Sequence, residues 1–114
     1  MEFKYHIKFN KEYKKLFKKY KSLDEDLEKF KKVLMLFPCG RGEKHWQELR
    51  KRNDLIILKT RLSCAYLKKS SLRVIYAYDR KTAKIEFIEI YFKGEKSRED
   101  KQRIEEYLKD NPNS

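Results

Sequence analysis

The first apolar pattern in the chain has a period of two and runs from Phe3 to Phe9. Each aromatic or aliphatic residue in it is followed by Lys or His, as in a strand with one buried face. His6 lies on the polar side of this pattern, so we interpret it as an exposed strand residue and not as a catalytic one. The pattern predicts a short, half-buried strand.

After this strand the period becomes helical. Asn10 can cap a helix, and apolar residues then recur three or four positions apart as far as Tyr20. Ser22 and Glu25 have the spacing of a capping box, which predicts the start of a second helix, and Pro38 ends it. The apolar stripe of the second helix consists of Leu23, Leu27, Phe30, Val33, Leu34 and Phe37. Two short amphipathic helices with almost no linker predict a helical hairpin.

The stretch from Cys39 to Asp54 follows neither period and contains two glycines, Gly40 and Gly42. We interpret it as a loop with room for one helical turn. Trp46, the sole tryptophan, lies in this stretch. Its indole has two interpretations, a lid packed on the core or a platform for a nucleobase, and the lid is the commoner use of such a residue.

From Leu55 onward the pattern favours strands. Three segments rich in aliphatic and aromatic residues stand out, and they are Leu55 to Leu62, Leu72 to Tyr78 and Lys84 to Phe92. Residues 79–83 read as a hairpin turn, residues 63–71 as a polar connection, and residues 97–109 as a final helix. The expected fold class is α+β in the order β-α-α-β-β-β-α, a single domain over residues 1–114. Its sheet is expected to be four-stranded and mainly antiparallel, with the helical hairpin and the other helix packed on one face.

Charge narrows the range of partners. The chain has 30 Lys and Arg against 18 Asp and Glu, a formal net charge of +12. A field of this size attracts polyanions, so we expect a nucleic acid, an acidic protein, or both. The longest apolar run, Val33 to Phe37, is far too short to span a membrane, and the N-terminus has no signal-peptide pattern. Cys39 and Cys64 have no metal-binding spacing, so we expect no metal, no cofactor and a cytoplasmic location.

The strands carry cations at unusual positions. Lys59 and Arg61 share one face of their strand with two aliphatic residues, and Arg73 interrupts an otherwise apolar strand. A cation inside a sheet is costly unless it is paired or faces a cleft. Two interpretations follow. Either Arg73 pairs with a carboxylate such as Glu86 or Glu89, or the cations gather on one concave surface together with Lys93.

These segments resemble a known family. Lys59 to Leu62, Lys68 to Tyr76 and Phe87 to Lys96 look like the RelE/ParE superfamily of type II toxins, in which a basic pair, an Arg-Val-Ile-Tyr strand and a basic strand end recur. The resemblance covers residues 3–109. It departs from the family where Ser70 and Ser71 replace glycines, and no tyrosine clearly matches the one that some members use, since Tyr91 and Tyr107 both fit poorly.

The resemblance implies a ribonuclease that cuts messenger RNA on the ribosome and is neutralised by a cognate acidic antitoxin. It implies Lys59, Arg61, Arg73 and Lys93 as site residues. Further RNA contacts are expected from basic residues outside this set, namely Arg50, Lys51, Arg52, Lys68, Lys69 and Lys96.

Such a site works without histidine or metal. Arginine stays protonated and suits bidentate phosphate binding, so Arg73 is the candidate phosphate clamp and Arg61 its electrostatic support. Lysine can act as a base only if its pKa is lowered, which neighbouring cations and burial both favour, so Lys59 is the candidate base. Lys93 is the candidate acid or second phosphate contact.

Two other functions remain open. A ParE-like inhibitor of DNA gyrase would share the fold, but such proteins generally lack the clustered basic site. The other is a non-catalytic RNA-binding module or an inactive relative. Aromatic residues exposed on the sheet, where bases could stack on them, would favour such a module. In this sequence the aromatic residues lie mostly in the apolar stripes.

Overall fold

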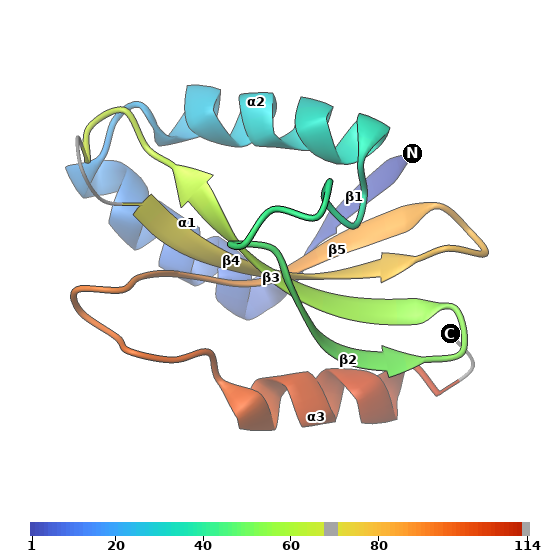
Figure 1. The fold of residues 1–114 in the computed structure, drawn as a ribbon. Coiled ribbons are helices and arrows are strands. Elements are labelled where there is room, and N and C mark those ends of the chain that lie inside the picture. The colour runs from blue at the N-terminus through green and yellow to red at the C-terminus, as the bar shows by residue number, and fades with distance from the viewer. Residues whose placement is uncertain (68–70, 113–114) are drawn as a thin grey trace.

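A five-stranded mixed sheet forms the centre of the molecule, and helices cover both of its faces (Figure 1). The computed structural model describes residues 1–67 and 71–112. The elements in chain order are β1 (Glu2–Tyr5), α1 (Ile7–Lys19), α2 (Leu23–Leu36), β2 (Gln47–Arg52), β3 (Leu55–Ser63), β4 (Ser71–Asp79), β5 (Lys84–Phe92) and α3 (Lys101–Asp110).

The strand order is β1-β5-β4-β3-β2. Strand β1 pairs parallel to β5, and every other pairing is antiparallel. The expectation of an α+β fold with a mainly antiparallel sheet and a helical hairpin is confirmed, but the count of four strands is wrong. The segment from Cys39 to Asp54 was interpreted as a loop, whereas its second half is β2. An edge strand that is exposed on most of its length can carry charged residues, so its sequence lacks the alternating apolar pattern.

The first strand is shorter than expected. It ends at Tyr5, and α1 begins at Ile7 with His6 as its N-cap, whose Nδ1 accepts a hydrogen bond from the Lys8 amide at 3.1 Å. The strand expected as far as Phe9, the Asn10 cap and the strand role of His6 are therefore wrong. Phe9 is buried and lies seven residues before Leu16, a spacing that keeps both on one side of the helix.

Helix α2 begins as expected, but the capping box does not form. Ser22 is the N-cap by position, yet its side chain makes no cap hydrogen bond. The Ser22 hydroxyl instead donates to Asp26 Oδ2 at 2.7 Å. The same carboxylate accepts the Ala65 amide at 3.2 Å. Asp26 thus ties the start of α2 to the segment that follows β3.

The sheet has an apolar core on each face. The larger core lies under α1 and α2 and includes Phe9, Leu34, Tyr76 and Phe87. The smaller core lies under α3 and consists of Leu55, Ile57, Ile75, Ala77, Ile88, Ile104 and Leu108. The expectation that all helices share one face is wrong for α3, because both faces of the central strands are apolar and each must be covered. No helix in the described ranges has the length and apolarity to cross a membrane.

Candidate active site

Strands β3 and β4 bring cations together on the α3 face of the sheet, and β5 places a tyrosine beside them. The register pairs Arg61 of β3 with Arg73 of β4, and Arg73 with Tyr91 of β5. These three residues form a row across the sheet, and side chains in neighbouring positions of such a row are about 5 Å apart at Cβ. The next row consists of Lys59, Ile75 and Glu89. We call Lys59, Arg61, Arg73 and Tyr91 the strand cluster.

Arg73 lies in the middle of this cluster and is half-buried. Burial and then the neighbouring charge of Arg61 lower the pKa of Arg73, and the Tyr91 phenol opposes this shift. The carboxylates considered as structural partners of Arg73 have other contacts. Glu89 accepts from Lys96 Nζ and from the Asp100 amide, and Glu86 accepts from the Tyr107 hydroxyl at 3.4 Å.

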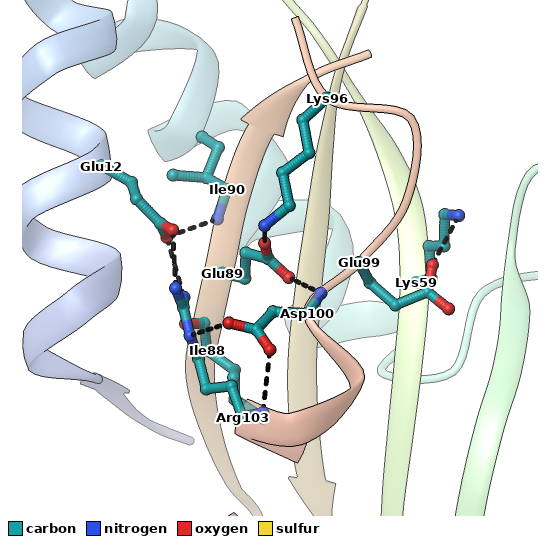
Figure 2. A network of polar contacts seen from close by, with 9 residues as sticks. All are labelled: Glu12, Lys59, Ile88, Glu89, Ile90, Lys96, Glu99, Asp100 and Arg103. Atoms are coloured by element: carbon teal, nitrogen blue, oxygen red, sulfur yellow. Dashed lines mark hydrogen bonds and ion pairs between the residues drawn. The ribbon is translucent and has the colours of Figure 1, made fainter.

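Lys59 forms an ion pair that was not anticipated. Its Nζ donates to Glu99 Oε1 at 2.9 Å, and both side chains are largely buried (Figure 2). Burial lowers the pKa of Lys59, but the Glu99 carboxylate and the nearby Tyr91 phenol outweigh it, so the pKa lies above its ordinary value. The expectation of a lowered pKa is therefore wrong, because sequence reasoning counted neighbouring cations and missed this carboxylate. Lys59 also lowers the pKa of Glu99, against the effect of burial.

Tyr91 is the functional candidate that sequence reasoning left doubtful. Its side chain is 5% exposed, and among the described residues its hydroxyl has no hydrogen-bond partner. A buried phenol usually has a partner, and this one lies close enough to Lys59 to raise the pKa of that lysine. The strand register is the signal that places Tyr91 opposite Arg73.

The segment between β5 and α3 is anchored to Glu89 of β5 (Figure 2). Lys96 donates to the buried Glu89, and its ammonium lies 5.5 Å from the centre of the Tyr91 ring. Glu89 also accepts the Asp100 amide at 2.8 Å. These contacts place Lys96, expected as an RNA contact, and Glu99 next to the strand cluster.

The other expected site residues are dispersed. Lys93 follows the end of β5 and is exposed, and no contact with the strand cluster is present for it in the described part of the chain. Arg50 of β2 pairs with Glu105 of α3. Arg52 donates to the carbonyls of Leu108, at 2.8 Å, and Asn111, so it stabilises the C-terminal end of α3.

Three further residues complete the set. Lys51 is exposed on β2. The expected RNA contacts Lys68 and Lys69 lie outside the described residues, as does Ser70.

Trp46 packs as a lid on the core, as the commoner interpretation predicted. Its ring lies 6.5 Å from that of Phe30, centre to centre. Gly40, at φ +80°, lets the ring approach closely, because a Cβ there would lie 1.6 Å from Trp46 Cε3. Gly40 is therefore needed for both its backbone angle and its lack of a side chain.

The strand cluster suits phosphate chemistry. Its cations are the side chains that hold phosphate in proteins, and Tyr91 and the Lys59–Glu99 pair supply groups that can exchange protons. Within residues 1–67 and 71–112, no three His, Cys, Asp or Glu side chains come close enough together to hold a metal ion.

Comparisons with known proteins bear on the fold. No protein-family model matches the sequence, and no curated protein matches it. A structural match is found with a chain of the archaeal RelE–RelB complex from Pyrococcus horikoshii OT3, at a TM-score of 0.62 and 22% sequence identity. The match covers 82% of this chain and 94% of that chain. The chain therefore has a RelE-like fold, and the resemblance noted in the sequence is confirmed for the fold.

Proposed function

We propose that this chain is the toxin of a type II toxin–antitoxin system and cleaves messenger RNA on the ribosome without a metal ion. The observation that carries the proposal is the row of Arg61, Arg73 and Tyr91, with Lys59 beside it, at one end of a sheet face. The RelE-like fold supports the choice of this activity over other phosphate chemistry. The proposed place of action is the cytoplasm, where messenger RNA is translated.

In this proposal the two arginines stabilise the charge of the scissile phosphate. Arg73 is in the middle of the row and presents its planar guanidinium as a two-pronged donor, and the more exposed Arg61 adds a second positive charge. Donors that are already in position when charge develops contribute about 10²- to 10³-fold each to the rate. The Tyr91 hydroxyl donates a hydrogen bond to a phosphate oxygen. Lys93 and Lys96 contact the RNA on either side.

The Lys59–Glu99 pair carries the protons. Glu99 has a lowered pKa and is ionised at neutral pH, so its carboxylate takes the proton of the attacking 2′-hydroxyl. The 2′-oxygen then forms a bond to phosphorus, and the bond from phosphorus to the 5′-oxygen breaks. Lys59, protonated because its pKa is raised, gives its proton to that 5′-oxygen. Transfer of one proton from Glu99 to Lys59 across 2.9 Å restores the pair. This assignment replaces the role of Lys59 as base.

The proposed protein partner is a cognate acidic antitoxin. The net charge of +12 provides a strong attraction for an acidic chain, and the comparison structure is itself a RelE–RelB complex. Such a partner would lower activity by covering the strand cluster or by competing for its charges.

A cleavage assay with purified protein, run with and without ribosomes, tests the activity. Purified protein added to translating ribosomes should produce new transcript ends, while the same transcript without ribosomes stays intact. The variant Arg61→Ala/Arg73→Ala, with an unchanged melting temperature, should produce none. Intact transcripts together with broken DNA would support the gyrase inhibitor instead, and RNA binding with neither kind of break would leave a binding module.

A further inference from the structure

The solvent side of α1 is a continuous surface of lysines. Six of its thirteen residues are lysine and all six are exposed, namely Lys8, Lys11, Lys14, Lys15, Lys18 and Lys19. At 3.6 residues per turn these positions fall within an arc of about 140°. The other exposed residues of α1 are Ile7 and Asn10. We call this surface the α1 lysine face.

This arrangement is unfavourable for the protein alone. Lys11 and Lys15, like Lys14 and Lys18, are four residues apart, where equal charges repel. The first turn of α1 contains no acidic residue, although the helix dipole favours one there. The acid of the helix, Glu12, is turned to the other side, where it accepts two hydrogen bonds from Arg103 at 3.0 and 2.8 Å. A bound polyanion would relieve this repulsion.

The α1 lysine face continues into the strand cluster. A groove of about 250 Å³ runs between α1 and the end of β5, and Lys15, Tyr91 and Lys96 line it. The two carboxylates of the same groove, Glu12 and Glu95, are paired with Arg103 and Lys19. Lys19 of α1 pairs with Glu95 at 3.2 Å, in the segment that follows β5. A single extended polyanion could therefore contact both surfaces.

We infer that the α1 lysine face is a second RNA-binding surface, which holds the RNA backbone beyond the segment at the strand cluster. Lysines present point charges on flexible stems, so they contact phosphates without reading bases. From Lys8 to Lys19 the face is about 17 Å long. A membrane surface fits less well, because an interfacial helix inserts its apolar side into lipid and that side of α1 is packed on the core. The choice of RNA as the polyanion rests on the proposed function.

Two variants with equal charge test this inference. Lys11→Gln/Lys14→Gln/Lys18→Gln removes three charges from the α1 lysine face, and Lys81→Gln/Lys84→Gln/Lys109→Gln removes three exposed charges elsewhere. A fluorescent RNA hairpin is titrated with each protein at several salt concentrations. The α1 variant should bind at least ten-fold more weakly than the wild type, and its log–log salt slope should fall by about 2 to 3, the value for three lost phosphate contacts. The control variant should stay within about two-fold of the wild type.

If both variants bind RNA equally weakly, the inference is overturned, because the loss of affinity would then follow from net charge and not from the position of the lysines. If the α1 variant loses more affinity for phosphatidylserine vesicles or for polyglutamate than for RNA, the choice of RNA as the polyanion is overturned. Cleavage is scored separately. If the wild type cleaves no transcript, but the α1 variant alone binds RNA more weakly, the proposed function is refuted and the α1 lysine face remains an RNA-binding surface. Lys14→Glu alone serves as a second probe if the triple variant folds poorly.

Discussion

Arg73 lies in the middle of the row across the sheet, between the Arg61 cation and the Tyr91 phenol. We predict that Arg73→Ala lowers transcript cleavage by about 10²- to 10³-fold with little change in the unfolding free energy. Arg73→Lys should recover part of the activity, because lysine keeps the charge and loses the planar fork. Cleavage and thermal unfolding are measured on the same preparations. A stability loss of about 3 to 5 kcal/mol with unchanged activity per folded molecule would mean that Arg73 serves structure.

Glu99 offers a second test at the residue scale. The direction in which pH changes its contribution to stability follows from its lowered pKa. The folded state lowers the pKa of Glu99, so the pair stabilises the fold above the unfolded pKa of about 4.5 and loses this effect as pH falls through the lowered value. Glu99→Gln should therefore cost about 2 kcal/mol at pH 7, and the difference from the wild type should shrink as pH falls below 4.5 and through the lowered pKa of Glu99.

Denaturant unfolding at several pH values measures this difference. The same variant should lose transcript cleavage. Glu95→Gln is the matched control, because Glu95 pairs with Lys19 in an exposed position and should change neither quantity. Full cleavage by Glu99→Gln would refute its role as proton acceptor and leave the ion pair as a structural feature.

At the scale of elements, one ion pair connects α1 and α3 across the edge of β5 (Figure 2). Strand β1 covers β5 only as far as Phe87, and beyond that point Glu12 Oε1 accepts the Ile90 amide at 3.2 Å. The same carboxylate binds Arg103, whose side chain is 8% exposed. Glu12 thus takes the place of a missing strand and holds both helices to the sheet.

Removing this carboxylate should be costly. We predict that Glu12→Ala lowers the unfolding free energy by about 3 kcal/mol, because it leaves a buried guanidinium without its main partner. Arg50→Gln is the control. It breaks a pair in which both side chains are about half exposed, and it should cost at most about 1 kcal/mol. Chemical denaturation measures both variants, and equal losses would show that the Glu12–Arg103 pair adds nothing beyond a surface contact.

At the scale of the whole molecule, net charge opposes folding. The charge of +12 is confined to a body with a radius of gyration of 13.4 Å. At about 10 mM salt the Debye length is about 30 Å, so the charges repel one another throughout the molecule, and at about 150 mM it is about 8 Å. We predict that the melting temperature rises by several degrees between these two salt concentrations.

Scanning calorimetry in NaCl and in KCl measures this rise and separates ionic strength from specific ion binding. The Lys11→Gln/Lys14→Gln/Lys18→Gln variant should show a smaller rise, because it carries three fewer positive charges. A melting temperature that falls with salt would mean that the ion pairs outweigh the repulsion.

The sequence by itself determined most elements and the face of the strand cations. Apolar periods of about 3.6 and 2 reflect which side of a helix or strand is buried, and burial dominates the energy of each element. The hairpin α1–α2, the strands β3, β4 and β5 and the helix α3 were therefore predicted. Lys59 and Arg61 had to share a face, because strand residues two apart always do. Strand β2 had no such signal, since backbone pairing to β3 holds it at the edge.

The tertiary structure decided which residues meet the strand cations. Tyr76 pairs with Phe87 but Ile75 pairs with Glu89, so Ile88 is an extra residue in β5. Counting back from the hairpin turn without this bulge would place Ile90, and not Tyr91, opposite Arg73. One added residue turns every later side chain to the other face, so the bulge is what brings Tyr91 and Glu89 to the α3 side. Glu99 reaches Lys59 across forty residues of sequence for a similar reason, because the register of the sheet and the docking of α3 set that distance, and no local pattern encodes either.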